Sequence, residues 1–268
     1  MFSSITNFIN NFTQDPVNAL ISLAYLTVCI LFSLIIHECA HGYVALRCGD
    51  PTAKMLGRLT LNPAKHLDPV GTICMIFLHV GWAKPVPVNP RNFRNYRRDY
   101  ILVSLAGIIT NFCIFLVSLI ISAILAKVMY TPEVINDFSR AGIKSLFLNI
   151  YSQDLINNVS FYVYNGLPLI DEAMSVPALA WVQRLFLMLA QMNLGLAIFN
   201  LLPVPPLDGY RFLDQFAFRG QLRMDPRTMQ IIQIVFLFIC VSGFLSGLLG
   251  TLNSAVFGFF SNIIGVII

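Results

Sequence analysis

Residues 17–41 read VNALISLAYLTVCILFSLIIHECAH, and this stretch decides the fold class. Its first part, residues 17–36, contains no charged side chain. About 20 apolar residues are enough for a helix to cross the roughly 30 Å hydrocarbon core of a bilayer. The polar group His37-Glu38-Cys39-Ala40-His41 follows without a break. The sequence therefore predicts a transmembrane helix that carries this group at its end.

The composition of the whole chain agrees with a membrane protein. Of its 268 residues, 57% are hydrophobic and only 11% are charged, and the mean hydropathy is +0.73. One soluble core would not bury so much apolar surface. The net charge of +4 comes from basic residues between apolar runs, without interleaved aromatic platforms, so we expect no nucleic-acid partner. The six cysteines form no CxxC pair and are expected to be reduced packing residues.

Further apolar runs predict the remaining membrane spans. Clear runs lie at about 101–126, 178–202, 229–248 and 250–268, the last two joined by a tight turn that contains glycine. With the first helix they give about five full spans. We therefore expect an all-α polytopic membrane protein that forms a single domain over residues 1–268.

Two other segments are apolar but too short or too amphipathic to span. Residues 70–82 are followed by closely spaced prolines, so a re-entrant or hairpin segment is expected there. Residues 1–14 place Phe2, Ile5, Ile9 and Phe12 at helical spacing, which is typical of an amphipathic helix at the membrane interface.

The basic residues predict the orientation. Nine lie between Arg47 and Arg98 and four between Arg211 and Arg227, whereas residues 130–180 hold only Arg140 and Lys144 together with five acidic residues. By the positive-inside rule the loops 47–98 and 211–227 are cytoplasmic and the segment 130–177 is external. That external segment is either an interfacial cap that filters substrates or an ordinary variable loop.

His37 and His41 have the spacing of a zinc half-site. Positions i and i+4 lie on the same face of a helix, so both imidazoles can bind one metal ion. Glu38 is rotated about 100° from His37 and can reach a water molecule at that metal as general base. A charged group at a helix centre costs about 2.5–3.5 kcal/mol, which makes three ionisable residues in five positions improbable without a function.

The third ligand is expected to come from far downstream. A catalytic zinc needs a third protein ligand and an open position. Asp208 stands in NLLPVPPLDG (200–209), where prolines end a transmembrane helix and Gly209 permits a sharp turn. The alternative for Asp208 is a capping role at the start of the next helix.

Two asparagines and two more histidines are further polar candidates near these motifs. Asn111, in the middle of the 101–126 span, is interpreted first as an interhelical hydrogen-bonding residue and second as a substrate contact. Asn200 could hold the substrate backbone or stabilise an oxyanion. His66 and His79 are interpreted as structural residues.

Taken together, the motifs resemble the site-2 protease family of intramembrane metalloproteases in its compact prokaryotic form, without a PDZ or CBS domain. The motifs that carry the resemblance, in chain order, are HECAHGYVA, GRLTLNPAKHLDPVGT, GWAKPVPVNP, SLAG with Asn111, and NLLPVPPLDGYR. One departure is Ile108, which stands where the family usually has a proline.

This resemblance implies one zinc ion per chain, bound by His37, His41 and Asp208, with Glu38 as catalytic base. It implies cleavage of the transmembrane segment of a membrane-anchored protein within the bilayer of a prokaryotic cell membrane. The segment 84–90, with Pro85, Val86 and Pro87, is similar to the element that pairs with an unwound substrate, and Asn200 is expected to help handle it.

Three other classes of protein could carry these motifs. A prenyl-protease type of zincin would need a glutamate as third ligand, and the two other glutamates, Glu133 and Glu172, lie in the predicted outer loop. A metal-ion transporter would need ionisable residues on several spans, and few are present. A catalytically silent pseudoprotease that acts as a binding module is compatible with the sequence.

Overall fold

The computed structural model describes residues 13, 16–68, 71, 84–132, 163–164, 167–168, 174–222 and 224–267. The predicted interfacial helix (1–14), the re-entrant segment (70–82) and the external segment (130–177) lie wholly or mostly outside these residues. Cys74 and His79 also lie outside them.

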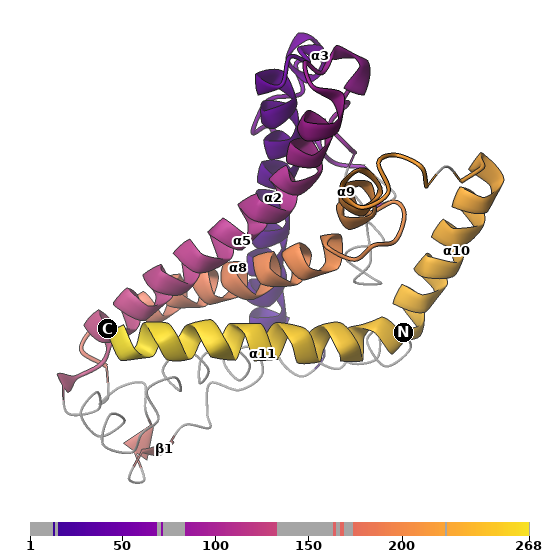
Figure 1. Cartoon of the computed structure of the whole chain (residues 1–268). Helices are drawn as coiled ribbons and strands as arrows, with labels where there is room; N and C mark the ends of the chain where they lie inside the picture. The colour runs from indigo at the N-terminus through magenta and orange to yellow at the C-terminus, as the bar shows by residue number, and fades with distance from the viewer. Residues whose placement is uncertain are drawn as a thin grey trace.

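Helices make up most of the described chain, which confirms the all-α prediction (Figure 1). The long helices are α2 (Pro16–Arg47), α5 (Tyr96–Met129), α8 (Leu179–Asn200), α10 (Pro226–Ser242) and α11 (Phe244–Ile267). The short ones are α3 (Thr52–Met55) and α9 (Asp208–Phe216), with 3-10 turns η1 (Pro63–Lys65) and η2 (Pro90–Asn92). Two-residue strands β1 (Val163–Tyr164) and β2 (Leu167–Pro168) pair antiparallel.

Four of the described helices have the length and composition to cross a membrane, within α2, α5, α8 and α11. The predicted C-terminal pair differs from the structure in its bounds, because the turn falls at Gly243 and not near residue 249. Gly243 adopts the left-handed conformation (φ 83°), which ends α10 after 17 residues. Gly247 and Gly250 continue as helix inside α11.

The hydrophobic core lies where α5 and α8 pack together and α11 crosses them (Figure 1). Phe115 of α5 is fully buried, and its ring lies 6.1 Å from that of Phe257 and 5.6 Å from that of Phe260, both of α11. Leu119 and Leu187 are buried in the same cluster. These contacts fix the position of α5, the helix against which α2 also packs.

Polar side chains also join the spans inside the protein. Asn193 Nδ2 of α8 donates to Ser33 Oγ of α2 over 2.8 Å. Gln183 Nε2 of α8 donates to the Ser122 carbonyl of α5 over 3.1 Å. Bonds of this kind satisfy polar groups that lipid cannot. They hold both α2 and α5 to α8.

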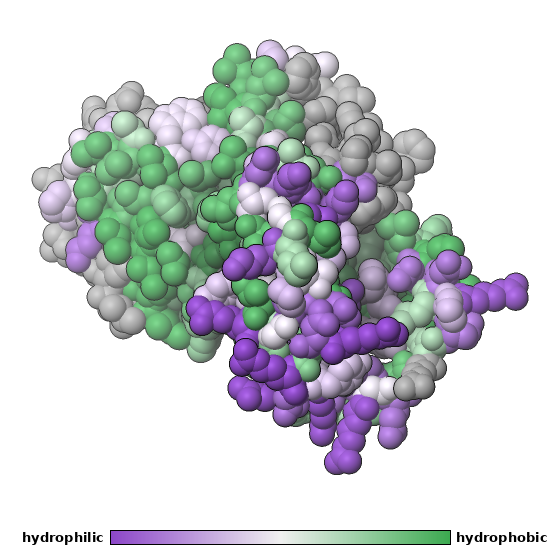
Figure 2. Space-filling model, turned by 90° about the horizontal axis from the view of Figure 1, so that it is seen from above, coloured by the Kyte–Doolittle hydropathy of each residue, from purple (hydrophilic) through white to green (hydrophobic). Residues whose placement is uncertain are grey.

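The two basic regions meet at one end of the molecule. Arg97, at the start of α5, donates to the Gln215 and Phe216 carbonyls at the end of α9 over 3.0 and 2.9 Å. Figure 2, a view onto the end that carries α3, shows hydrophilic residues gathered there beside broad hydrophobic areas. The described parts of the basic regions 47–98 and 211–227 are therefore on the same side, which agrees with the positive-inside rule.

Truncation of Phe115 tests this core. We expect Phe115→Ala to lower the free energy of unfolding by about 3 kcal/mol, because the ring's packing partners on α11 lose their contacts. Ile120→Ala, at a residue of the same helix that is 43% exposed, should cost less than about 1 kcal/mol. Unfolding in detergent micelles measures both, and equal losses would contradict the assigned core.

Candidate metal centre

Helix α2 continues straight through the motif, so His37, Glu38 and His41 lie on consecutive turns of one helix. Both histidines are buried, with exposures of 5% and 8%, while Glu38 is half-buried. Their Nε2 atoms lie 3.1 Å apart. The helical spacing thus brings both imidazoles to one point inside the protein.

Asp208 reaches the same point from the connection between α8 and α9. The chain leaves α8 after Asn200, and residues 201–207, with three prolines, form a series of turns. Asp208 is the first residue of α9. A Cβ atom on Gly209 would lie only 2.2 Å from the Leu201 carbonyl oxygen, so only glycine allows α9 to start this close to the end of α8.

Three atoms converge at this point. Asp208 Oδ2 lies 3.2 Å from His37 Nε2 and 3.0 Å from His41 Nε2. The three residues are buried and form the group of potential metal ligands found in the described part of the chain. Ligands at about 2.0–2.1 Å from a tetrahedral zinc lie about 3.3 Å from one another. The observed separations are close to one face of such a tetrahedron.

The hydrogen bonds of the histidines support a cation at this point. His41 Nδ1 lies 2.7 Å from the Val103 carbonyl oxygen, which can only accept, so Nδ1 carries a proton and Nε2 is the nitrogen that can bind a metal ion. His37 Nδ1 lies 3.1 Å from Asn111 Nδ2, and the Asn111 Oδ1 atom has no hydrogen-bond partner within the described residues. With the amide turned over, Oδ1 accepts the Nδ1 proton and His37 Nε2 is the nitrogen that can bind a metal ion. Asp208 Oδ2 is buried, and its polar neighbours are the two Nε2 atoms. Two Nε2 atoms and one carboxylate oxygen at this spacing are a nitrogen and oxygen donor set that fits zinc.

Helix α5 supports His37 in a way that the sequence only partly indicated. A Cβ atom on Gly107 would lie 2.4 Å from His37 Cε1, so the imidazole packs directly on the α5 backbone. The small residues of SLAG predicted close helix packing, which this contact confirms. They did not indicate that the group packed there is the ring of a candidate metal ligand. Ile108, in place of the family's usual proline, continues α5 as regular helix.

Glu38 has a backbone partner that no motif indicated. The Val86 N–H donates to Glu38 Oε2 over 2.8 Å. Val86 lies in the segment 84–89, which belongs to no helix or strand. Pro85 and Pro87 flank it, so these two of the predicted substrate-binding residues lie next to the motif helix.

The other candidate residues have the following places. Asn111 is fully buried and bonds His37, which agrees with the interhelical hydrogen bond preferred for it. Asn200 Nδ2 donates to the Leu196 carbonyl of its own helix over 3.0 Å. His66 is buried, and its Nε2 lies 2.7 Å from the Thr60 carbonyl oxygen, away from the metal ligands. The five described cysteines are free thiols.

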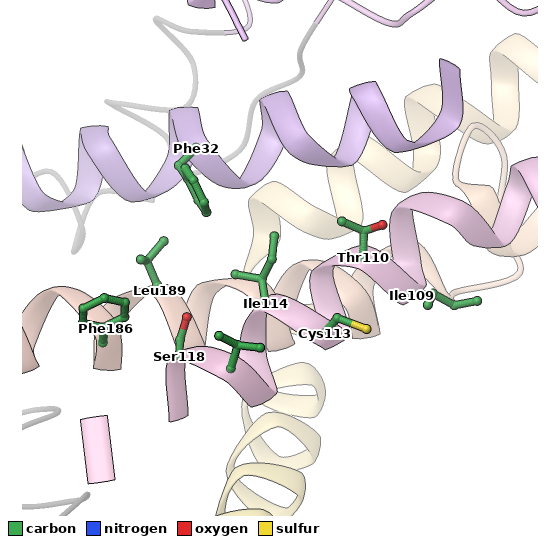
Figure 3. A pocket seen from close by; sticks show the side chains of 9 residues that line it. Phe32, Ile109, Thr110, Cys113, Ile114, Ser118, Phe186 and Leu189 are labelled. Carbon is green, nitrogen blue, oxygen red and sulfur yellow. The ribbon is translucent and has the colours of Figure 1, made fainter. Parts of the chain in front are cut away.

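A pocket of about 340 Å³ opens between α2, α5 and α8 (Figure 3). Phe32 of α2, Phe186 and Leu189 of α8, and residues of α5 between Ile109 and Ser118 line it. Its walls are apolar apart from a few hydroxyl and thiol groups. None of the three converging ligands lines it, so this space suits hydrocarbon and not a metal ion.

The contact between Gly107 and His37 gives a direct test of the site. We expect Gly107→Ala to weaken zinc binding about 10- to 100-fold, because the added methyl group displaces the His37 ring. Gly195→Ala in α8 is the matched control, since a Cβ atom there meets nothing within 4 Å. Competition with a chromogenic chelator measures both affinities. Equal affinities would show that His37 is not held by this contact.

Comparison with known proteins identifies the family of this chain. The model of peptidase family M50 matches residues 25–243, a range that contains both histidines and Asp208. The Bacillus subtilis (strain 168) protein "Putative zinc metalloprotease YwhC" is 34% identical over 220 residues, which cover 82% of this chain and 81% of that protein. No solved structure matches the chain significantly. The resemblance to the site-2 protease family is thus confirmed, and the chain belongs to peptidase family M50 as a multi-pass membrane metalloprotease.

Proposed function

We propose that this protein is an endopeptidase that cleaves transmembrane segments of membrane-anchored proteins, with one zinc ion held by His37, His41 and Asp208. The observation that carries the proposal is the convergence of two Nε2 atoms and one carboxylate oxygen within 3.2 Å of one another. Their burial excludes bulk water, and the carboxylate of Glu38 stands on the same helix. A metal-assisted hydrolysis needs these parts.

Glu38 is the proposed general base. Bound zinc would supply a water molecule acidic enough to lose a proton near neutral pH. Glu38 accepts that proton and returns it to the amine that leaves when the peptide bond breaks. Asn111 and the Val103 carbonyl keep the two imidazoles oriented, and so act on the ligands and not on the substrate.

The segment 84–89 is the proposed surface for an unwound substrate. Peptide hydrolysis needs an extended backbone, which a transmembrane helix does not offer. Pro85 and Pro87 have no N–H, and the Pro87 carbonyl accepts no hydrogen bond from the described residues. An extended peptide can therefore add to this edge by donating its own N–H groups. The contact between Val86 and Glu38 puts the edge beside the base.

The site is proposed to open toward the cytoplasmic half of a prokaryotic cell membrane. The basic loops 47–98 and 211–227 meet through the bonds from Arg97 to the end of α9. Asp208 begins that helix, and the metal-binding turns of α2 precede Arg47. A cytoplasmic location for the basic end would bring both halves of the site to that side.

Replacement of the base tests the reaction. Glu38→Gln should abolish cleavage of a co-expressed membrane-anchored substrate and keep the zinc content, because the amide binds no proton but leaves all three ligands in place. Substrate cleavage on immunoblots and metal content by mass spectrometry are the two measurements. Unchanged cleavage would refute the proposed mechanism. Zinc without any cleavage by the unaltered protein would favour the pseudoprotease.

Removal of the distant ligand tests the metal set. Asp208→Ala should lower the zinc content of the purified protein to a small fraction, because two histidines alone are an incomplete site. Asp214→Ala is the matched control on the same helix; its carboxylate accepts from the Leu222 N–H and contacts neither histidine. That variant should keep its zinc. Full zinc occupancy in Asp208→Ala would remove Asp208 from the ligand set.

A further inference from the structure

Asp50, three residues beyond the end of α2, is the centre of a buried hydrogen-bond cluster. Its side chain is fully buried. Oδ1 accepts from the Thr52 N–H over 3.1 Å, from Thr52 Oγ1 over 2.5 Å and from Asn92 Nδ2 over 2.8 Å. Oδ2 accepts from the Asn89 N–H over 2.7 Å. One carboxylate thus joins the end of the motif helix to a segment about 40 residues further along the chain.

The segment that Asp50 holds is the one that contacts the proposed base. Asn89 ends the stretch 84–89, whose Val86 N–H donates to Glu38 Oε2 over 2.8 Å. At the other end of the stretch, the Arg58 guanidinium donates to the Lys84 and Pro85 carbonyls over 2.9 and 3.1 Å. The segment is therefore anchored on both sides of Val86.

The sequence of the segment makes the position of the Val86 N–H depend on these anchors. Pro85 and Pro87 have no N–H, so Val86 carries the sole N–H between Lys84 and Val88. Their rings fix φ and stiffen the chain between the anchors. Val86 also packs on α2, because a Cβ atom on Gly42 would lie 2.9 Å from Val86 Cγ1. A shift at Asn89 is therefore transmitted to the Val86 N–H.

We propose that Asp50 is a positioning residue for the hydrolysis: by holding Asn89 and Asn92 it keeps the Val86 N–H on Glu38 Oε2. This bond fixes the carboxylate rotamer and leaves Oε1, which has no hydrogen bond within the described residues, to take the proton. A base must be held close to its productive geometry, since an error of about 1 Å can cost about 100-fold in rate. The proposal rests on Glu38 acting as the base.

Asp50→Asn is the test variant. An amide in place of the carboxylate turns an NH2 group toward one of the donors that the carboxylate accepts, so the cluster loosens. We expect kcat to fall about 10- to 100-fold, KM to change less than about threefold, and zinc content to stay the same. Cleavage of a transmembrane-segment peptide in detergent, with metal analysis, measures all three.

Asp99→Asn is the matched control. Asp99 is also a buried aspartate at this end of the protein, with an exposure of 5%, and it accepts from the Asn95 N–H over 2.8 Å. It has no bond to the segment 84–92. Its kcat should change less than about threefold. An equal fall in both variants would mean general destabilisation and overturn the proposal.

A second variant and a double-mutant cycle test the link from Asp50 to Glu38 further. If Asp50→Asn does not fold, Asn92→Ala removes a single bond to Asp50 and should lower kcat in the same direction. In a Glu38→Asp background, whose shorter side chain no longer reaches Val86, the loss caused by Asp50→Asn should shrink. An unchanged loss there, or an unchanged kcat in Asp50→Asn, refutes the role of Asp50. If Glu38→Gln abolishes cleavage, the proposed function survives either result.

Discussion

The structure depends on the close approach of three electron-pair donors inside an apolar protein. Two imidazole nitrogens and one carboxylate oxygen lie 3.0–3.2 Å from one another, and all three residues are buried. In a medium of low dielectric constant, burial of polar atoms without a compensating charge is costly. A divalent cation bound between the three atoms would compensate them by coordination. Much of the surrounding structure serves to keep these atoms together.

Three helices share this task. Helix α2 supplies both imidazoles through its four-residue spacing, and α9 supplies the carboxylate at its first residue. Helix α5 supplies no ligand, but the Gly107 backbone, the Val103 carbonyl and the Asn111 amide fix the two rings. Helix α5 is in turn held by the core around Phe115 and by Arg97, which bonds the end of α9. The core packing and the site geometry are therefore coupled through one helix.

Much of this could be predicted from local sequence patterns. Apolar runs gave the spans, and the spacing of His37 and His41 gave a half-site, because both depend on helical periods that the sequence displays directly. Contacts between segments far apart in the chain could not be predicted in this way. The bond from Val86 to Glu38 uses a backbone N–H, which has no residue signature, and the cluster around Asp50 joins ordinary polar residues. The end of α10 at Gly243 depended on which of several glycines takes a left-handed conformation.

X-ray absorption at the zinc edge of the purified membrane protein measures the metal environment most directly. The proposed ligand set predicts one zinc per chain with nitrogen and oxygen ligands at about 2.0–2.1 Å, two of them imidazoles, and no sulfur. A sulfur ligand at about 2.3 Å, which Cys39 of the motif would supply, or a protein that binds no zinc, would refute this ligand set.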